Sequence, residues 1–328
     1  MLSHYLVAQI RPSVLWLLGQ KCSGSFPCVA RGEKRIYCLR DHISLVIPFL
    51  HFGPVTIPTF GLSVACAMLI AYFVLRADLA RRGIADAKSG EAETLVASPC
   101  LAGFVGAKLY HLLETPSEFF ADPVGLLFSP YGFAWFGGLL AGFAAFAFVA
   151  WRIVKRSAAA GKPLSFLTIL DAGSPAAALG YGIGRIGCFL SGDGDYGIPT
   201  SLPWGMAFPN GLVPTTARVH PTPIYELIVA CAIAWVLWRM GAPRNSAELP
   251  KRKQDRVAGD KTVRPGEIFA MYLLLTGVAR FLVEFIRINP RSFLGMSNAQ
   301  AAGAVSAVAG IALYLFLRNR NAALVPIH

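Results

Sequence analysis

Residues 164–189 read LSFLTILDAGSPAAALGYGIGRIGCF, a stretch that is long and apolar enough to cross a lipid bilayer as one helix. The stretch also contains Asp171 and Arg185, and it continues as LSGDGDYG over residues 190–197, which adds Asp193 and Asp195 near the lipid boundary. An ionisable side chain in this environment is costly unless it has a partner or a chemical task. The sequence therefore predicts a membrane helix that ends in a cluster of charged groups with one of these two roles.

The whole chain has the composition of an integral membrane protein. Of its 328 residues, 55% are hydrophobic and 15% are charged, whereas a soluble domain carries about 25% charged residues. Seven segments approach the roughly 20 apolar residues that a membrane helix needs, and they are 58–76, 96–113, 134–151, 165–186, 222–238, 266–286 and 298–317. We predict an all-α polytopic membrane protein with about seven transmembrane helices.

The distribution of the basic residues predicts which loops face the cytoplasm. The formal net charge is +12, and the Lys and Arg residues fall mainly in the loops after the first, third and fifth segments and in the C-terminal tail. The positive-inside rule places these loops in the cytoplasm, with the C-terminus cytoplasmic, the N-terminus outside and residues 190–197 facing outward. The basic-aromatic pattern of a nucleic-acid groove is lacking, so we expect membrane lipid and not nucleic acid as a partner.

The chain outside the apolar segments divides into three parts. Residues 1–42 form an N-terminal tail whose Lys and Arg residues conflict with an outer location, so we interpret it as a mis-called start or as a short interfacial helix. Residues 43–320 form the membrane domain, and 241–264 form a basic cytoplasmic loop within it. The seven cysteines show neither a CxxC pair nor metal-ligand spacing, so neither a metal nor a disulfide framework is expected.

Three charged residues share one face near the end of the sixth segment. Arg280 and Glu284 are four residues apart, and Glu284 and Arg287 are three apart, so all three are neighbours on a helix. They form either a structural ion-pair ladder or, because two arginines face one carboxylate, a binding site for a phosphate group. Arg185 adds a further cation at a similar outer depth, which makes a phosphodiester lipid the ligand to consider.

Three further polar residues lie between the fourth and fifth segments, and each has either a structural or a chemical interpretation. The sequence SGDGDYG is rich in turn formers, so Asp195 is interpreted as a solvated turn residue. Asp193 lies closer to the helix end and is a candidate to orient Arg185 or a substrate hydroxyl. His220 precedes a Pro-flanked helix start, where it either braces the chain or transfers a proton.

Four stretches, in order along residues 45–318, resemble the prolipoprotein diacylglyceryl transferase family. They are GRIGCFLSGD at 184–193, the overlapping LDAGSPAAALGYGIGRIG at 170–187, VHPTPIYE at 219–226 and RFLVEFIR at 280–287. The resemblance implies a seven-helix enzyme of the bacterial inner membrane with a periplasmic-side head region. It further implies transfer of the diacylglyceryl group of phosphatidylglycerol to the lipobox cysteine of a prolipoprotein signal peptide, with formation of a thioether and release of glycerol phosphate.

The same resemblance assigns roles to residues of this chain, with no cofactor. The expected catalytic residues are Arg185, Asp193, Arg280, Glu284 and His220. The residues expected to bind phosphatidylglycerol are Arg185, Ser191, Tyr225, Glu226 and Arg287.

The signature departs from the family pattern at several positions. Cys188 and Ser191 stand where the family has Asn, Asp193 stands where it has Glu, and the GDGDYG loop is one residue longer. Cys188 is interpreted as a small helix residue, because buried cysteines in apolar surroundings are inert.

Two phenylalanines replace polar residues of the family. Phe136 stands where the family has His or Tyr, and Phe60 stands where it has Tyr. Phenylalanine accepts no proton, so proton removal from the substrate thiol falls to His220 or Asp193, or needs no dedicated base. The alternative function is that of a catalytically altered relative that binds or translocates phospholipid.

Overall fold

The computed structural model describes residues 46–84, 90–129, 132–162, 164–242, 263–291 and 295–322. The tail predicted over residues 1–42 lies outside the described residues. So does the basic loop predicted over 241–264, apart from its two ends.

Seven long helices lie over the seven apolar segments, so the predicted all-α membrane fold is confirmed. Their bounds are α1 Thr59–Arg81, α2 Glu91–Glu114, α5 Trp135–Ala159, α6 Phe166–Ser191, α7 Thr222–Met240, α9 Glu267–Val283 and α10 Asn298–Ala322. Within the described residues, five helices are long and apolar enough to cross a membrane, namely α1, α2, α5, α7 and α10. The other two are α6, which carries Asp171 and Arg185, and α9, which has only 17 residues. The count of seven crossings therefore stays a prediction.

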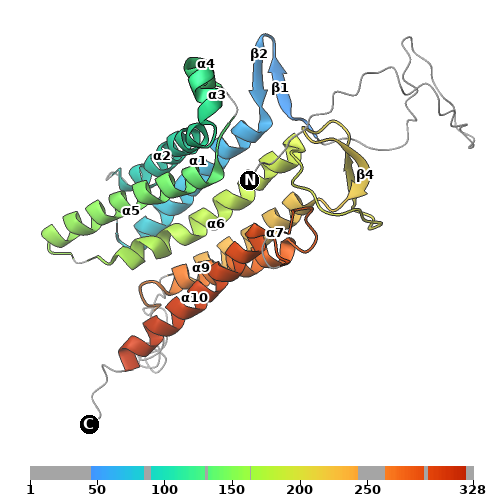
Figure 1. Ribbon diagram of the computed structural model, residues 1–328. Coiled ribbons are helices and arrows are strands. Elements are labelled where there is room, and N and C mark those ends of the chain that lie inside the picture. The colour runs from blue at the N-terminus through green and yellow to red at the C-terminus, as the bar shows by residue number, and fades with distance from the viewer. Residues whose placement is uncertain are drawn as a thin grey trace, which may run out of the picture. The chain divides into compact units, whose positions relative to one another are not determined.

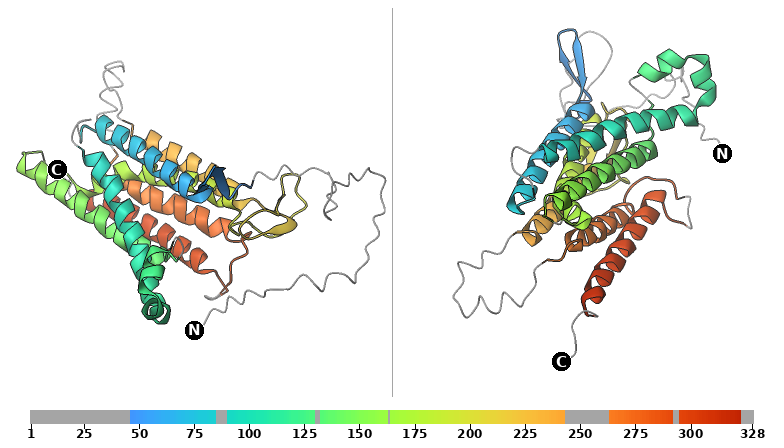
Figure 2. Two further views of the ribbon diagram at one scale, coloured as in Figure 1. Left: turned by 90° about the horizontal axis from the view of Figure 1, so that it is seen from above. Right: turned by 90° about the vertical axis from the view of Figure 1, so that its left-hand side faces the viewer.

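Helix α6 occupies the middle of the helical bundle (Figure 1). It packs against α1 on one side and α7 on the other, while α2 pairs with α5 and α9 pairs with α10. Figure 2 shows the same arrangement from two further directions. The apolar stretch that contains Asp171 and Arg185 is thus surrounded by protein along much of its length.

Short elements gather at the end of the bundle where α6 ends (Figure 1). Two antiparallel hairpins pair β1 Phe49–Phe52 with β2 Val55–Pro58, and β3 Met206–Phe208 with β4 Thr215–Val219. Two short helices, α3 Pro116–Ala121 and α4 Pro123–Phe128, connect α2 to α5. Val46, Phe208 and Val219 form a small buried cluster beneath the second hairpin. The segment between α6 and the second hairpin lies next to the end of α9, because the amide of Ile198 donates a hydrogen bond of 2.8 Å to the carbonyl of Ile286.

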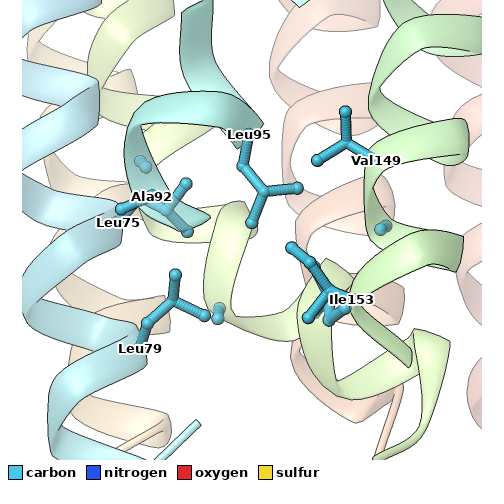
Figure 3. Close-up of a cluster of buried hydrophobic side chains, with 10 residues drawn as sticks. Leu75, Leu79, Ala92, Leu95, Val149 and Ile153 are labelled. Carbon is cyan, nitrogen blue, oxygen red and sulfur yellow. The ribbon is translucent and has the colours of Figure 1, made fainter. Parts of the chain in front are cut away.

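The opposite end of the bundle contains the largest apolar core. Leu75 and Leu79 of α1, Leu95 of α2 and Ile153 of α5 point toward one another there (Figure 3). Basic residues close this end, because Arg81, Arg156 and Arg239 lie in the last turns of α1, α5 and α7. The basic residues and the charged cluster at the end of α6 are therefore at opposite ends of the bundle.

Asp171 stabilises the start of a neighbouring helix. Its side chain is 2% exposed, and it accepts hydrogen bonds from the backbone amides of Gly266 at 2.7 Å and Phe269 at 2.8 Å. The first amides of a helix have no partner within the helix and attract negative charge. Asp171 of α6 therefore caps α9, which gives this intramembrane carboxylate a structural partner.

Glycine permits close approach of α2 and α5. A Cβ added to Gly137 would lie 2.3 Å from the carbonyl oxygen of Gly106 and 2.3 Å from the Cβ of Tyr110. Small residues allow membrane helices to pack backbone against backbone in this way.

We predict that Gly137→Ala destabilises the protein by about 1–3 kcal/mol, the typical cost of overpacking a tight contact. The matched control is Gly173→Ala on α6, where the added Cβ would meet its nearest neighbour at an ordinary 3.8 Å. Thermal unfolding in detergent should show a lower Tm for the first variant and an unchanged or higher Tm for the second. Equal Tm values for the two variants would contradict the role of the α2–α5 contact.

Candidate active site

The charged residues at the end of α6 converge from four separate parts of the chain. Arg185 lies in the last turns of α6, and Glu226 lies near the start of α7. Arg280 lies in the last turn of α9, and Arg287 follows the end of that helix. The loop between α6 and β3 adds Asp195. Because α6 and α9 end where α7 begins, the fold itself brings these groups together.

Glu226 is the centre of this cluster and is only 6% exposed. Its Oε1 lies 2.8 Å from Nη1 of Arg280, and its Oε2 lies 3.2 Å from Nη1 of Arg287. The hydroxyl of Tyr181 donates a hydrogen bond of 2.6 Å to Oε1, and Nε of Arg185 lies 3.6 Å from Oε2. One carboxylate therefore joins three arginines from two helices and the segment after α9.

Asp195 forms ion pairs with both Arg185 and Arg287. Its backbone is fixed as well, because its carbonyl accepts a hydrogen bond from the hydroxyl of Thr222. The interpretation of Asp195 as a solvated turn residue is therefore wrong. Gly192 and Gly194 adopt positive φ angles of 58° and 94°, a conformation that turns the chain sharply and that glycine tolerates. The turn brings Asp195 to the arginines.

Asp193 lies beside this network without joining its ion pairs. The partners of Arg185 among the described ion pairs are Asp195 and Glu226, so the expected orientation of Arg185 by Asp193 is not observed. Asp193 Oδ1 instead accepts a hydrogen bond of 3.2 Å from the backbone amide of Asp195. Asp195, and not Asp193, is thus the aspartate of this loop that pairs with Arg185, while the predicted catalytic role of Asp193 stays a prediction.

The surroundings of the two aspartates shift their pKa values in opposite directions. Burial, and then repulsion by Asp195, raises the pKa of Asp193 above its ordinary value. Burial also opposes ionisation of Asp195, but the guanidinium groups of Arg287 and Arg185 outweigh it and hold the pKa of Asp195 below its ordinary value. Asp195 therefore loses its proton more readily than a free aspartate, whereas Asp193 retains its proton more readily.

The positive surplus that the α9 sequence suggests is cancelled by other elements. Arg185, Arg280 and Arg287 are matched by Asp195, Glu226 and Glu284 through ion pairs. The three arginines differ in access, since the exposed fraction of the side chain is 27% for Arg280, 17% for Arg185 and 6% for Arg287. Arg280 and Arg185 are thus the members that an incoming ligand can reach.

Glu284 is held by a second set of polar side chains that the sequence analysis missed. Its carboxylate accepts hydrogen bonds from Asn289 at 2.8 and 2.9 Å and from the hydroxyl of Ser297 at 2.8 Å, and it pairs with Nη2 of Arg280 at 2.7 Å. Ser297 and Gln300 also form reciprocal hydrogen bonds of 3.0 Å with each other's backbone amides at the start of α10. The S-x-x-Q spacing before an apolar run is a capping-box signal that the sequence contains.

His220 and Tyr225 form a separate polar group next to the cluster. Nδ1 of His220 lies 3.2 Å from the hydroxyl of Tyr225, which also accepts a 2.7 Å hydrogen bond from Nε1 of Trp204. The backbone carbonyl of His220 accepts a hydrogen bond of 2.8 Å from the amide of Gly197. His220 therefore braces the loop that carries Asp195, and its role in proton transfer stays a prediction.

Ser191 and Cys188 occupy less accessible positions in the last turn of α6. Ser191 is 1% exposed and donates a hydrogen bond of 3.2 Å to the carbonyl of Cys188, so its hydroxyl already has a partner within the helix. The side chains of Cys188, Asp193 and Asp195 place possible metal-ligand atoms within 4.8 Å of one another. However, Nη1 of Arg185 lies 3.7 Å from the sulfur of Cys188 and Arg287 already neutralises Asp195, so the local charge disfavours a cation.

Comparisons with known proteins show which family this chain resembles. The family model described as prolipoprotein diacylglyceryl transferase matches residues 48–316 of the chain. A phosphatidylglycerol–prolipoprotein diacylglyceryl transferase from Bordetella avium is 31% identical over 275 residues, which cover 82% of this chain and 89% of the relative. Proteins of the same name from Bordetella bronchiseptica and Clostridium tetani are each 30% identical, over 81% and 67% of this chain and 93% and 78% of those relatives.

We predict opposite effects on stability at pH 7 for the two aspartate variants. Asp195 has a lowered folded-state pKa, so its stabilising effect is present above the unfolded-state pKa and is lost as the pH falls through the folded-state pKa. Asp195→Asn should therefore lower the Tm. Asp193 has a raised pKa, so its ionisation costs stability as the pH rises, and Asp193→Asn should leave the Tm unchanged or raise it.

Thermal unfolding of both variants between pH 5 and pH 8 tests this prediction. Each Asn keeps one side-chain oxygen and replaces the other with an uncharged amide nitrogen, so both variants make the same change and serve as controls for each other. An equal loss of Tm in both variants would contradict the assignment.

Proposed function

The chain belongs to the prolipoprotein diacylglyceryl transferase family and is a multi-pass membrane enzyme of the transferase class, and from this premise we propose its reaction. The thiolate of a prolipoprotein lipobox cysteine attacks the diacylglyceryl carbon bonded to the phosphate of phosphatidylglycerol. A carbon–sulfur bond forms, the carbon–oxygen bond breaks, and glycerol phosphate leaves with the electron pair. The thiol proton passes to a group on the enzyme.

The observation that carries this proposal is the position of two accessible arginines around Glu226. Arg185 and Arg280 come from the ends of α6 and α9, and each keeps part of its side chain exposed. Positively charged donors held in place where charge develops stabilise a transition state, and the leaving group here is a phosphate anion. Arg287 is buried among carboxylates, so we assign it to bracing Glu226 and Asp195 and not to direct phosphate contact.

We propose that Asp193 accepts the proton of the substrate thiol. Phe136 and Phe60 accept no proton, and Asp195 is held as an anion by two arginines. Asp193 lies in the same loop, outside these ion pairs, and its raised pKa brings it closer to the working pH that suits a general base. His220 interacts with Tyr225 and with the loop backbone, which supports a positioning role.

The proposed location is the bacterial inner membrane, with the charged cluster on the outer side. The basic residues at the opposite end of the bundle support this orientation through the positive-inside rule. Both substrates, phosphatidylglycerol and the signal peptide of a prolipoprotein, reside in the bilayer and would reach the cluster laterally.

We predict that Arg185→Ala lowers transfer of labelled diacylglycerol to a prolipoprotein about 100-fold or more, the usual effect of removing a donor to a developing anion.

Asp193→Asn should lower kcat with little change in KM for phosphatidylglycerol. The control is Arg318→Ala, because Arg318 lies near the end of α10 and hydrogen-bonds Tyr314, far along the chain from the cluster. The assay uses purified protein in vesicles that contain phosphatidylglycerol.

Two results would overturn the proposal. Folded wild-type protein that binds phosphatidylglycerol without transferring it would favour a catalytically altered relative. Full activity of Arg185→Ala would remove this arginine from the reaction.

We predict that Ser297 acts as a positioning residue through Glu284. Ser297→Ala removes both the cap of α10 and the hydrogen bond to Glu284, whereas Gln300→Ala removes only part of the cap. Both should lower stability by about 1 kcal/mol, but only Ser297→Ala should lower kcat, because Arg280 is then less firmly oriented. Ser297→Thr keeps the hydroxyl and should restore kcat. Equal kcat values for Ser297→Ala and Gln300→Ala would show that Ser297 has a structural role only.

A further inference from the structure

Five side chains near the C-terminal end of α5 form one exposed stripe, which we call the α5 patch. They follow the i, i+3, i+4, i+7, i+8 spacing of a single helix face, and they are Phe148, Trp151, Arg152, Lys155 and Arg156. Phe148 and Trp151 are 55% and 48% exposed. The mechanism proposed above uses none of these residues.

The other face of the same part of α5 packs into the bundle. Val149, Ala150 and Ile153 belong to the buried core that α5 shares with α1 and α2, and Figure 3 shows Val149 and Ile153 among the leucines of those helices. This packing fixes the rotation of α5 about its own axis. The α5 patch is therefore held facing away from the core.

The patch combines positive charge with apolar rings. Nζ of Lys155 lies 4.4 Å from the centre of the Trp151 ring, and the guanidinium carbon of Arg152 lies 5.8 Å from the centre of the Phe148 ring. The centres of the two rings are 5.9 Å apart. Because an aromatic ring attracts a cation over its face, rings and cations form one continuous surface.

The charge of the patch is not neutralised by nearby acidic residues. Residues 123–170 contain neither Asp nor Glu, and among the residues that the structure describes no ion pair joins a cation of the patch to a carboxylate. Arg81 and Arg82 at the same end of the bundle differ, since both pair with Asp78. The α5 patch can therefore attract an external anion.

The length of the patch matches the edge of a bilayer. Phe148 and Arg156 are eight residues apart, which corresponds to roughly 12 Å along a helix, and the headgroup layer on each side of a bilayer is about 5–8 Å thick. Aromatic side chains gather where hydrocarbon meets headgroups. With Phe148 and Trp151 at that boundary, the three cations lie at the depth of the lipid phosphates, which arginine side chains bind well.

We propose that the α5 patch binds the headgroup phosphate of an anionic phospholipid in the leaflet at this end of the bundle, the cytoplasmic leaflet in the proposed orientation. This site goes beyond the proposed reaction, because the charged cluster lies at the opposite end. An acidic protein segment would also be attracted by the cations. Lipid is the occupant that the patch fits, because its exposed rings continue the apolar surface of a membrane helix.

Photolabelling with phosphatidylserine tests the proposal, because this lipid is anionic but is not the lipid of the proposed reaction. The protein is placed in phosphatidylcholine vesicles with a small fraction of phosphatidylserine that carries a photoreactive group at the glycerol end of an acyl chain. We expect label within residues 148–162. Unlabelled phosphatidylserine should compete, and the same amount of added phosphatidylcholine should not.

A pair of matched double variants tests the cations themselves. Arg152→Gln with Lys155→Gln removes two charges and two cation–π pairs from the patch. The control, Arg239→Gln with Arg318→Gln, also removes two exposed charges and two cation–π pairs, on α7 and α10. The first should weaken competition by phosphatidylserine about fivefold for each cation removed, the usual effect of a basic residue near an anionic lipid surface, while the control should behave like wild type. Unchanged Tm values would confirm that both variants fold.

Four results would overturn the proposal. Equal competition by phosphatidylcholine would show ordinary surrounding lipid, and equal losses in the two double variants would show an effect of total charge. Inorganic phosphate that competes as well as phosphatidylserine would assign the patch to free phosphate. Displacement of the label by polyglutamate but not by phosphatidylserine would assign it to an acidic protein segment. Because the labelling needs no diacylglyceryl transfer, failure of the proposed reaction would leave the result unchanged.

Discussion

The carboxylate of Glu226 is the interaction on which the outer end of this protein depends. It is nearly buried, and it connects Arg280 of α9, Arg287 of the following segment and Arg185 of α6. Buried ions cost several kcal/mol each unless their partners are well placed, and removing one partner leaves an uncompensated charge. The ends of α6, α7 and α9 are therefore constrained to one relative position, whatever the ligand.

This balance of charge limits how strongly the cluster would bind the phosphate of the proposed substrate. Arginines with no counterion would bind any anion, including inorganic phosphate. Here each arginine already has a carboxylate partner. The free energy of phosphate binding is therefore only the difference between the new arginine–phosphate interactions and the ion pairs that they weaken. In the proposed reaction, binding of the lipid then depends on contacts to the rest of the ligand as well. A lipid phosphate and a free phosphate differ in this respect.

The long helices of this structure were predictable from local sequence, but the ion pairs that join them at the charged cluster were not. Hydropathy located the seven long helices, because each depends on a continuous apolar run. The three- and four-residue spacing placed Glu284 between Arg280 and Arg287. Glu226 and Asp195, however, lie 61 and 92 residues from Arg287, and only packing of the helices brings them together. The capping box at Ser297 was visible in the sequence, but its link to Glu284 required the fold.

The departures from the family signature have a common physical consequence in the loop after α6. The loop after α6 carries two acidic residues, Asp193 and Asp195, which lie in different surroundings. The two positive-φ glycines direct Asp195 to the arginines, so Asp195 supplies a carboxylate to both Arg185 and Arg287. Asp193 is thereby left outside the ion pairs with a raised pKa. In the proposed reaction, this loop therefore separates ion pairing, at Asp195, from acceptance of the thiol proton, at Asp193.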